Sequence, residues 1–122
     1  MEKICRFTDL ITWRKGHGLV LKVYGVVAKF PQHERFALSD QIRRAVISVT
    51  SNIAEGFSRQ GRKEKIQFYY LSMGSLTEVQ NQLLVARDVG YITPEEFMDI
   101  AVDSVEVSKL LRGLIKNVDK VV

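Results

Sequence analysis

Apolar residues recur at helical spacing in four long stretches of the chain, and short segments rich in turn residues separate these stretches. The clearest apolar stripe lies in the second stretch and consists of Ile42, Val46, Val49 and Ile53. Members of this stripe lie three or four positions apart, so they share one face of a helix. The first, third and fourth stretches show comparable spacing. The pattern therefore predicts an all-α protein with four helices.

The segments between the stretches carry residues that end or begin helices. Proline disfavours the α conformation in the residue before it, glycine ends helices readily, and hydroxyl or carboxylate side chains cap helix starts. These residues are Phe30-Pro31, Ser39 or Asp40 as an N-cap, Gly61, Gly90, and the capping-box pair Thr93 and Glu96. The helices are therefore expected at about residues 9–30, 40–59, 62–89 and 94–121.

Helices of roughly 20–28 residues would each be about 30–40 Å long. Because the expected connections are short, neighbouring helices must run antiparallel. Residues 1–122 are thus predicted to form one domain, an antiparallel up-down-up-down four-helix bundle. The first helix is apolar over more than one face, which predicts burial against its own domain and against another subunit. His17 falls on its apolar spacing and is expected in the core or at that subunit contact.

A polar stripe runs beside the apolar stripe of the second helix, and a similar one lies on the third helix. Gly74 next to it would let two helices approach closely. Buried polar groups need hydrogen-bond partners, and no glycine-rich phosphate loop accompanies the stripes, so a structural polar seam is favoured over a ligand site. The seam is expected either inside the bundle or at a subunit contact; its predicted members are Gln41, Arg44, Ser48, Asn52, Glu55, Ser75 and Glu78.

Positive charge is concentrated in the N-terminal half of the chain. The net charge is +4, and residues 1–61 hold ten Lys and Arg against five Asp and Glu. A basic turn over residues 58–65 would place several cations at one end of the bundle, where they could meet phosphates. The alternative is a solvated loop that only aids solubility. The candidate phosphate contacts are Arg59, Arg62, Lys63 and Lys65, with Arg14, Lys15 and Arg43 as weaker candidates.

The residue content offers little for catalysis. Carboxylate metal sites in four-helix bundles use Glu-x-x-His pairs, and no Glu stands three residues before His17 or His33. Cys5 is the only cysteine, so an internal disulfide and a thiolate metal cage are excluded. No signal peptide or membrane-spanning run is evident. We therefore expect a non-enzymatic cytoplasmic protein without a catalytic site, metal or cofactor.

Several motifs of the chain occur together in one known family. They are Trp13, Val23-Tyr24, Phe30-Pro31, Glu34-Arg35-Phe36, Leu38, the block Gln41-Ile42-Arg43-Arg44-Ala45, Ser48, the block Asn52-Ile53-Ala54-Glu55-Gly56, Arg59, Phe68, Gly74-Ser75, Glu78 and Gly90-Tyr91. In their order and spacing they resemble the 23S rRNA intervening-sequence proteins, also called four-helix-bundle proteins. The two blocks are the most specific part of the resemblance, which covers about residues 13–91.

The resemblance implies a homo-oligomeric ring, most simply a homopentamer. It also links the chain to accessory proteins of diversity-generating retroelements, which bind nucleic acid and a reverse transcriptase through a basic surface. The expected function is therefore binding of structured RNA or DNA by a basic surface of the oligomer. The alternative is a structural or adaptor ring that binds a protein partner, such as a reverse transcriptase, and no nucleic acid. Whether RNA or DNA is preferred does not follow from the sequence.

Overall fold

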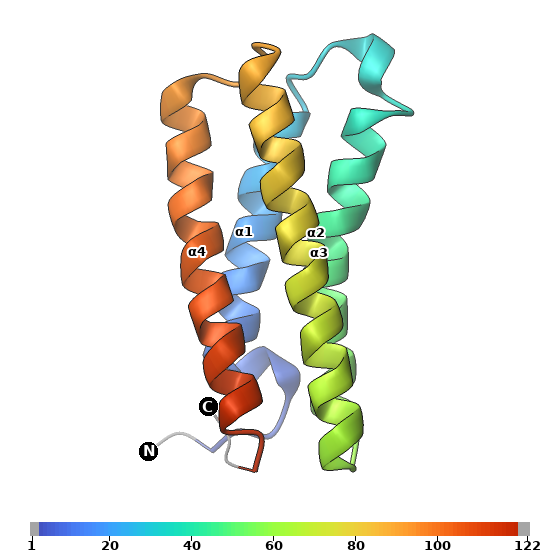
Figure 1. The fold of residues 1–122 in the computed structure, drawn as a ribbon, viewed down its shortest axis with the longest axis vertical. Coiled ribbons are helices and arrows are strands. Elements are labelled where there is room, and N and C mark those ends of the chain that lie inside the picture. The colour runs from blue at the N-terminus through green and yellow to red at the C-terminus, as the bar shows by residue number, and fades with distance from the viewer. Residues whose placement is uncertain (1–2, 120–122) are drawn as a thin grey trace.

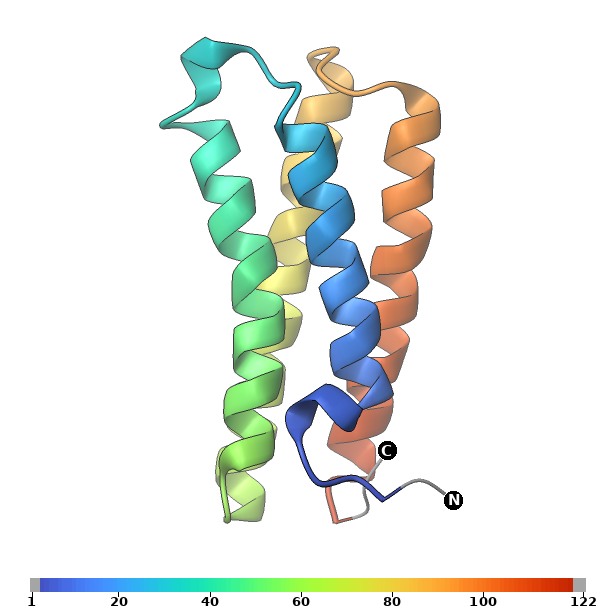
Figure 2. The same cartoon turned by 180° about the vertical axis from the view of Figure 1, so that it is seen from behind.

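Four long helices lie side by side with alternating direction in the computed structural model, which describes residues 3–119 (Figures 1 and 2). Each long helix contacts two neighbours, in the cyclic order α1, α2, α3, α4. The predicted up-down-up-down bundle is confirmed. Val121, predicted at the end of the fourth helix, lies outside the described residues. The elements are the 3-10 helix η1 (Phe7–Asp9), α1 (Ile11–Val27), the 3-10 helix η2 (Gln32–Glu34), α2 (Leu38–Ser58), α3 (Arg62–Asp88) and α4 (Pro94–Lys116).

Local sequence signals predicted the start of α4 correctly and the start of α2 incorrectly. At the start of α4 the Glu96 N–H donates to Thr93 Oγ1 at 3.1 Å, and the Thr93 N–H donates to Glu96 Oε1 at 2.9 Å. Gly90 adopts a φ of +85°, which favours glycine, just beyond the end of α3. The prediction that Ser39 or Asp40 caps α2 is wrong, because both residues lie inside the helix.

A residue from the preceding turn takes the place of the predicted cap of α2. The η2 turn brings the Glu34 carboxylate to the start of α2, where it accepts a hydrogen bond from the Leu38 N–H at 3.3 Å. The same carboxylate accepts a hydrogen bond from the Tyr91 hydroxyl at 2.7 Å, which lowers the pKa of Glu34. Glu34 therefore joins the start of α2 to the end of α3.

The core follows the predicted apolar stripes closely in α2 and α4. All four members of the α2 stripe are fully buried, and so are the central apolar residues of α4. On α1, His17 does not lie in the core, since it is exposed in the single chain and stacks on Trp13 with ring centroids 4.7 Å apart; its placement at a subunit contact stays a prediction. The buried face of α1 instead runs through Leu19, Val23 and Val27.

The closest approach between helices occurs at a different glycine from the one predicted. A Cβ added at Gly74 would meet no atom within 4 Å, so Gly74 does not permit a close contact. A Cβ added at Gly56 would lie 2.6 Å from the buried Tyr69 ring and 3.1 Å from Cβ of Phe68. Gly56 is therefore the residue that lets the end of α2 pack tightly against α3.

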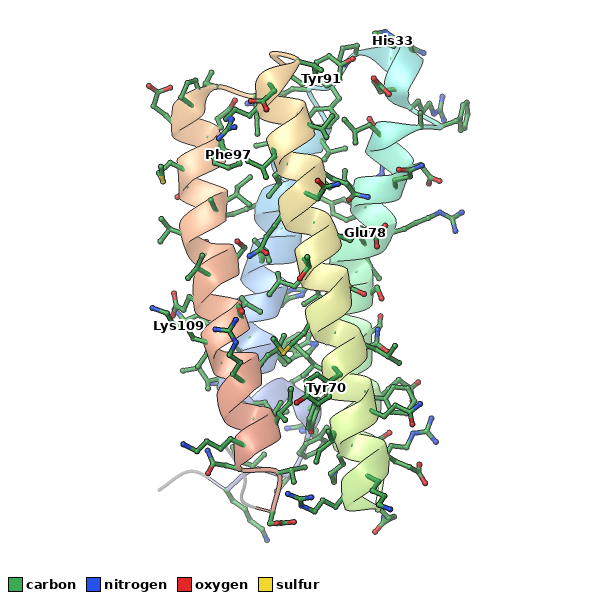
Figure 3. The ribbon with its side chains drawn as sticks, in the orientation of Figure 1. His33, Tyr70, Glu78, Tyr91, Phe97 and Lys109 are labelled. Atoms are coloured by element: carbon green, nitrogen blue, oxygen red, sulfur yellow. The ribbon has the colours of Figure 1, made fainter. Side chains whose placement is uncertain are left out.

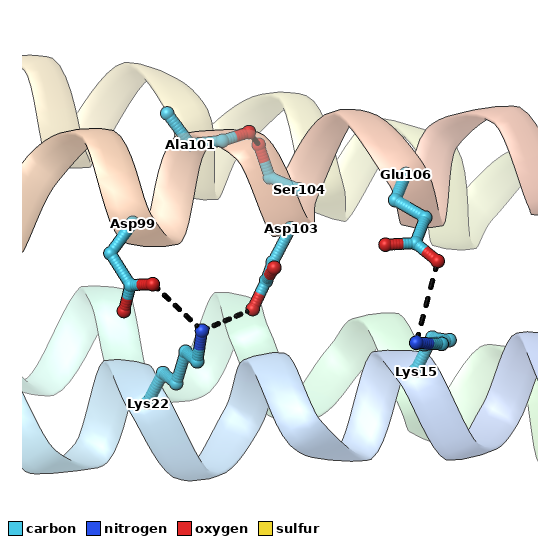
Figure 4. A network of polar contacts seen from close by, with 7 residues as sticks. All are labelled: Lys15, Lys22, Asp99, Ala101, Asp103, Ser104 and Glu106. Carbon is cyan, nitrogen blue, oxygen red and sulfur yellow. Dashed lines mark hydrogen bonds and ion pairs between the residues drawn. The ribbon is translucent and has the colours of Figure 1, made fainter.

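Ion pairs bridge α1 and α4 along their exposed edge (Figure 4). Lys22 Nζ lies 2.7 Å from a carboxylate oxygen of Asp103 and 3.0 Å from one of Asp99. The hydrogen bonds that Lys22 donates to these two carboxylates raise its pKa. Lys15 pairs with Glu106 at 3.5 Å, and Lys29 pairs with Glu96. No described helix combines the length and apolar character needed to cross a bilayer.

Candidate nucleic-acid interface

The basic turn between α2 and α3 brings Arg59, Arg62 and Lys63 to one end of the bundle, as the sequence predicted. Two of them form ion pairs with carboxylates of the same chain. Arg59 Nη2 lies 3.1 Å from Glu55 Oε2, and Arg62 Nε lies 3.3 Å from Asp119 Oδ2. Exposed pairs of this kind contribute about 0–1 kcal/mol, so a phosphate can compete with either carboxylate. The Arg59 guanidinium also lies 4.8 Å from the centre of the Phe68 ring.

Lys65 has a different position from its neighbours in the turn. Its Nζ donates to the backbone carbonyl of Phe57 at 2.8 Å and to that of Gly56 at 3.3 Å. These carbonyls lie at the C-terminal end of α2, where a cation also interacts favourably with the helix dipole. Burial lowers the pKa of Lys65. The contacts favour a capping role for Lys65 over a phosphate contact.

The remaining three predicted cations lie outside the turn, on α1 and near the start of α2. The Arg14 Nε donates to the Thr8 carbonyl at 2.9 Å, which holds η1 against the start of α1. Lys15 faces Glu106 on α4. Arg43 is half-buried near the start of α2, at the opposite end of that helix from the basic turn. Arg43 therefore lies away from Lys63, and Arg14 and Lys15 lie on α1, which is diagonal to α3 in the bundle.

A groove between α3 and α4 adds residues that the sequence analysis missed. It has a volume of about 450 Å³, and its polar lining comes from Tyr70, Arg112 and Lys116. Tyr70 is 59% exposed and lies near the basic end of α3 (Figure 3). Lys63 stands seven residues before Tyr70, so the two share a face of α3 about 10 Å apart. We call Lys63, Tyr70, Arg112 and Lys116 the basic-aromatic surface.

One signal in the sequence could have identified part of this surface. Lys109, Arg112 and Lys116 are spaced three and four apart, which places them along one side of α4. Basic residues near the C-terminal end of a helix also interact favourably with the helix dipole. In the sequence, this interaction explains the three residues without a binding surface. Their position beside Tyr70 depends on how α3 and α4 align, which the local pattern does not determine.

Within one chain, three of the predicted seam residues, Ser48, Asn52 and Ser75, form a polar seam. The hydroxyls of Ser48 on α2 and Ser75 on α3 share a hydrogen bond of 2.8 Å. The Asn52 Nδ2 donates to the Ser48 carbonyl at 2.9 Å and to the Ser48 hydroxyl at 3.0 Å. Next to them, Ser72 Oγ donates to the Val49 carbonyl at 2.7 Å. The seam thus joins α2 to α3 through uncharged groups.

The charged residues predicted for the seam face other partners. Arg44 pairs with Asp40 at 3.0 Å, one turn earlier on α2, and Glu55 pairs with Arg59. Glu78 accepts a hydrogen bond of 3.3 Å from Gln82 on its own helix (Figure 3 labels Glu78). Gln41 is exposed. These residues therefore lie along the edge of the seam and do not join α2 to α3.

The other half of the α3–α4 face is apolar. Leu84 on α3 and Met98, Val102 and Val105 on α4 are all exposed, and they border two shallow grooves. One of these grooves is also lined by Phe97, which Figure 3 labels. We call these four residues the apolar surface. Contiguous exposed apolar area of this kind is typical of an interaction site. Among residues 3–119, no group of three or more His, Cys, Asp or Glu side chains is placed to hold a metal ion.

Comparison with known proteins identifies the family. Residues 8–113 match the family model of the 23S rRNA-intervening sequence protein. A solved structure of a protein of unknown function from the S23 ribosomal protein family of Bacteroides thetaiotaomicron is 26% identical in sequence. It superposes with a TM-score of 0.80 over 87% of this chain and 96% of that chain. No curated protein matches the sequence. Because the family model covers most of the chain, the chain belongs to the 23S rRNA-intervening sequence protein family.

Proposed function

We propose that this protein is a non-enzymatic nucleic-acid-binding bundle that uses its basic-aromatic surface. The observation that carries the proposal is the exposed Tyr70 ring in a groove with Arg112 and Lys116, on the same face as Lys63. Cations that neutralise phosphates supply most of the affinity for nucleic acid. An exposed aromatic ring adds stacking on an unpaired base, worth about 1–3 kcal/mol.

The combination of cations and an aromatic ring favours one kind of nucleic acid. Bases in a regular duplex are stacked on one another and leave no free face for Tyr70. Loops, bulges and ends of structured RNA expose bases that can stack on aromatic side chains. We therefore propose structured RNA with unpaired bases as the preferred ligand. Arg59 and Arg62 would add phosphate contacts by releasing Glu55 and Asp119.

We also propose that the chain associates with copies of itself through the apolar surface. Val102 and Met98 are each more than half exposed. The groove that they line shares Val105 with the groove lined by Leu84. The ring proposed from the family resemblance requires contacts between different faces of adjacent copies. In such an oligomer the basic-aromatic surface would be repeated, and several weak phosphate contacts would then act together.

The nucleic-acid proposal is tested by fluorescence anisotropy with a labelled RNA hairpin and a DNA duplex of matched length. Arg112→Glu combined with Lys116→Glu should weaken hairpin binding at least tenfold, because attraction to phosphate becomes repulsion. Arg44→Glu, an exposed charge reversal on α2 away from the surface, is the control and should change binding little. Binding that survives the double reversal would refute the assignment of this surface.

The role of the aromatic ring needs its own comparison. Tyr70→Ala should weaken binding of a hairpin with an unpaired loop by about tenfold or more, and should affect the duplex much less. Tyr24→Ala removes another exposed tyrosine, on α1, and should leave both affinities unchanged. Equal losses for hairpin and duplex would contradict a stacking role for Tyr70.

A second candidate function is favoured by the apolar surface. In this case the protein is an adaptor that binds another protein, such as a reverse transcriptase, and the positive charge only aids solubility. Val102→Glu should then abolish capture of the partner, and the interaction should be insensitive to salt. Self-association is separated from this case by light scattering, in which Val102→Glu lowers the molar mass of the purified protein. Leu71→Glu, at an exposed position elsewhere on α3, is the control.

A further inference from the structure

A second basic pocket lies at the other end of the bundle, where the segment between α1 and α2 folds over the helix ends. Its volume is about 360 Å³. The polar lining comes from Gln32, Arg35, Ser39 and Arg43, and Phe30 and Pro31 form part of an apolar wall. The pocket is separate from the basic-aromatic surface, because it adjoins the start of α2 whereas Lys63 follows the end of that helix.

The two arginines of the pocket are not neutralised by the chain. Within residues 3–119, neither Arg35 nor Arg43 has a carboxylate oxygen in ion-pair range, although the Arg35 guanidinium lies 5.2 Å from the centre of the Phe36 ring. The only acids between residues 31 and 44 are Glu34 and Asp40. The Glu34 carboxylate accepts hydrogen bonds from Tyr91 and Leu38, and the Asp40 carboxylate holds Arg44. The pocket therefore keeps two positive charges.

A serine hydroxyl lies beside these charges. Ser39 is only 4% exposed as a residue and lines the pocket, and its hydroxyl makes no hydrogen bond to any other described residue. The oxygen itself is not sealed in the core, so a ligand in the pocket can reach it. A hydroxyl can donate to a phosphate oxygen, and arginine binds phosphate with paired N–H donors. The hydroxyl and the two guanidinium groups thus match the chemistry of one phosphate group.

We propose that this pocket binds a phosphate monoester carried on an organic group of nucleotide size. Arg35, Arg43 and Ser39 would hold the phosphate, and the Phe30–Pro31 wall would contact the base or sugar. A free nucleoside monophosphate and the 5′-phosphorylated end of a strand share this chemistry. The proposal does not depend on nucleic-acid binding by the basic-aromatic surface, which involves other residues.

Isothermal titration calorimetry with AMP tests the proposal, with adenosine and inorganic phosphate as comparison ligands. AMP should bind more tightly than inorganic phosphate, and adenosine should show no binding. Arg35→Gln and Arg43→Gln should each weaken AMP binding by about tenfold or more, since each removes charge-assisted hydrogen bonds. Arg44→Gln is the matched control, because Arg44 is the next residue but pairs with Asp40 outside the pocket. Lys63→Glu should also leave AMP binding unchanged.

Amide chemical shifts from NMR keep the test decisive where a variant is less stable. AMP should shift the amide signals of residues 30–43 in the wild-type protein and leave those of residues 60–70 in place. A 5′-phosphorylated oligonucleotide is then compared with its 5′-hydroxyl form. Tighter binding of the phosphorylated form would identify strand ends as a ligand, and equal affinity of the two forms would identify free nucleotides as the ligand. The proposal is overturned if millimolar AMP causes no shift, if inorganic phosphate binds as tightly as AMP, or if Arg44→Gln loses binding equally.

Discussion

Helix α3 has two sides with opposite characters. Toward α2 its serine hydroxyls are hydrogen-bonded within the chain, through the Ser48–Ser75 hydrogen bond and the bond from Ser72 to the Val49 carbonyl, whereas the buried Gln82 Oε1 has no partner among the described residues. Toward the outer face shared with α4 it exposes Tyr70 and Leu84 beside unburied cations and apolar residues of α4. The serine hydroxyls of the α2–α3 seam thus find partners within one chain, whereas the α3–α4 face leaves its aromatic and apolar side chains exposed.

This difference indicates that the α2–α3 seam stabilises the fold, whereas the α3–α4 face carries the proposed binding function. The polar stripe of α2 was predicted to be a structural seam in preference to a ligand site, and the structure uses Ser48 and Asn52 for helix packing. Substitutions in the seam should therefore change the free energy of unfolding and leave ligand affinity per folded molecule unchanged. Substitutions on the α3–α4 face should do the reverse.

The largest expected effect on stability is at the close contact of the α2–α3 seam. Gly56→Ala would place a methyl group 2.6 Å from the Tyr69 ring, which is buried and has little room to move. Overpacking of this kind should lower the free energy of unfolding by about 1–3 kcal/mol, measured by urea denaturation. Gly74→Ala is the control in open space and should raise it by about 0.5–1 kcal/mol. Equal effects at the two glycines would contradict the close packing at Gly56.

The hydrogen bond at the centre of the seam should have a smaller effect. Ser48→Ala and Ser75→Ala each remove one hydroxyl of the 2.8 Å pair. A double-mutant cycle should give a coupling of about 0.5–1.5 kcal/mol in the free energy of unfolding, the usual contribution of such a bond. Independent effects of the two substitutions would show that the hydroxyls do not interact across the helices.

On the outer face, removing side chains should cost little stability. Tyr70→Ala and Val102→Ser should each change the free energy of unfolding by about 0.5 kcal/mol or less, because these side chains are more than half exposed. The same proteins should show reduced RNA affinity and reduced self-association respectively. Thermal unfolding of both variants, measured together with the binding assays, checks this prediction. A large loss of stability at either position would contradict the claim that the outer face contributes little to folding.

Acid should distinguish the uncharged seam from the ion pair between Lys29, just after α1, and Glu96 on α4. The hydrogen bond and ion pair with Lys29 lower the pKa of Glu96 from its ordinary value of 4.5, so Glu96 favours the folded state when it is ionised. Its contribution should be present above about pH 4.5 and lost as the pH falls through the lowered pKa. The stability difference between wild type and Glu96→Gln should therefore vanish in acid, whereas the Ser48→Ala difference should persist. A pH-independent effect of Glu96→Gln would contradict this assignment.

The sequence was sufficient for features that depend on neighbouring residues and insufficient for those that depend on the alignment of helices. The α2 core stripe and the Thr93 capping box are local patterns, and both were predicted correctly. The cap of α2 was misassigned because the η2 turn places Glu34 where Ser39 was expected to act. Arg44 was predicted in the seam but forms an ion pair with Asp40, one turn away on the same helix.

The candidate site was only partly predictable for the same reason. The turn that carries Arg62 and Lys63 is a continuous segment, and its position at one end of the bundle followed from the predicted helices. Tyr70 and Arg112 lie on different helices more than forty residues apart, so only their packed alignment places them beside one groove. Lys65 was expected to face phosphates because its charge was visible, while its bond to the Phe57 carbonyl was not.

The most direct test of the central claim is the salt dependence of RNA-hairpin binding by wild type and by the triple variant Lys63→Ala, Arg112→Ala and Lys116→Ala. The slope of log affinity against log salt concentration counts phosphate contacts, at roughly 0.7–0.9 per contact. The account predicts a steep slope for wild type that becomes shallower by about 2–3 in the variant, counted per chain bound. A slope that the three substitutions leave unchanged, or wild-type protein that fails to bind the hairpin even at low salt, would contradict it.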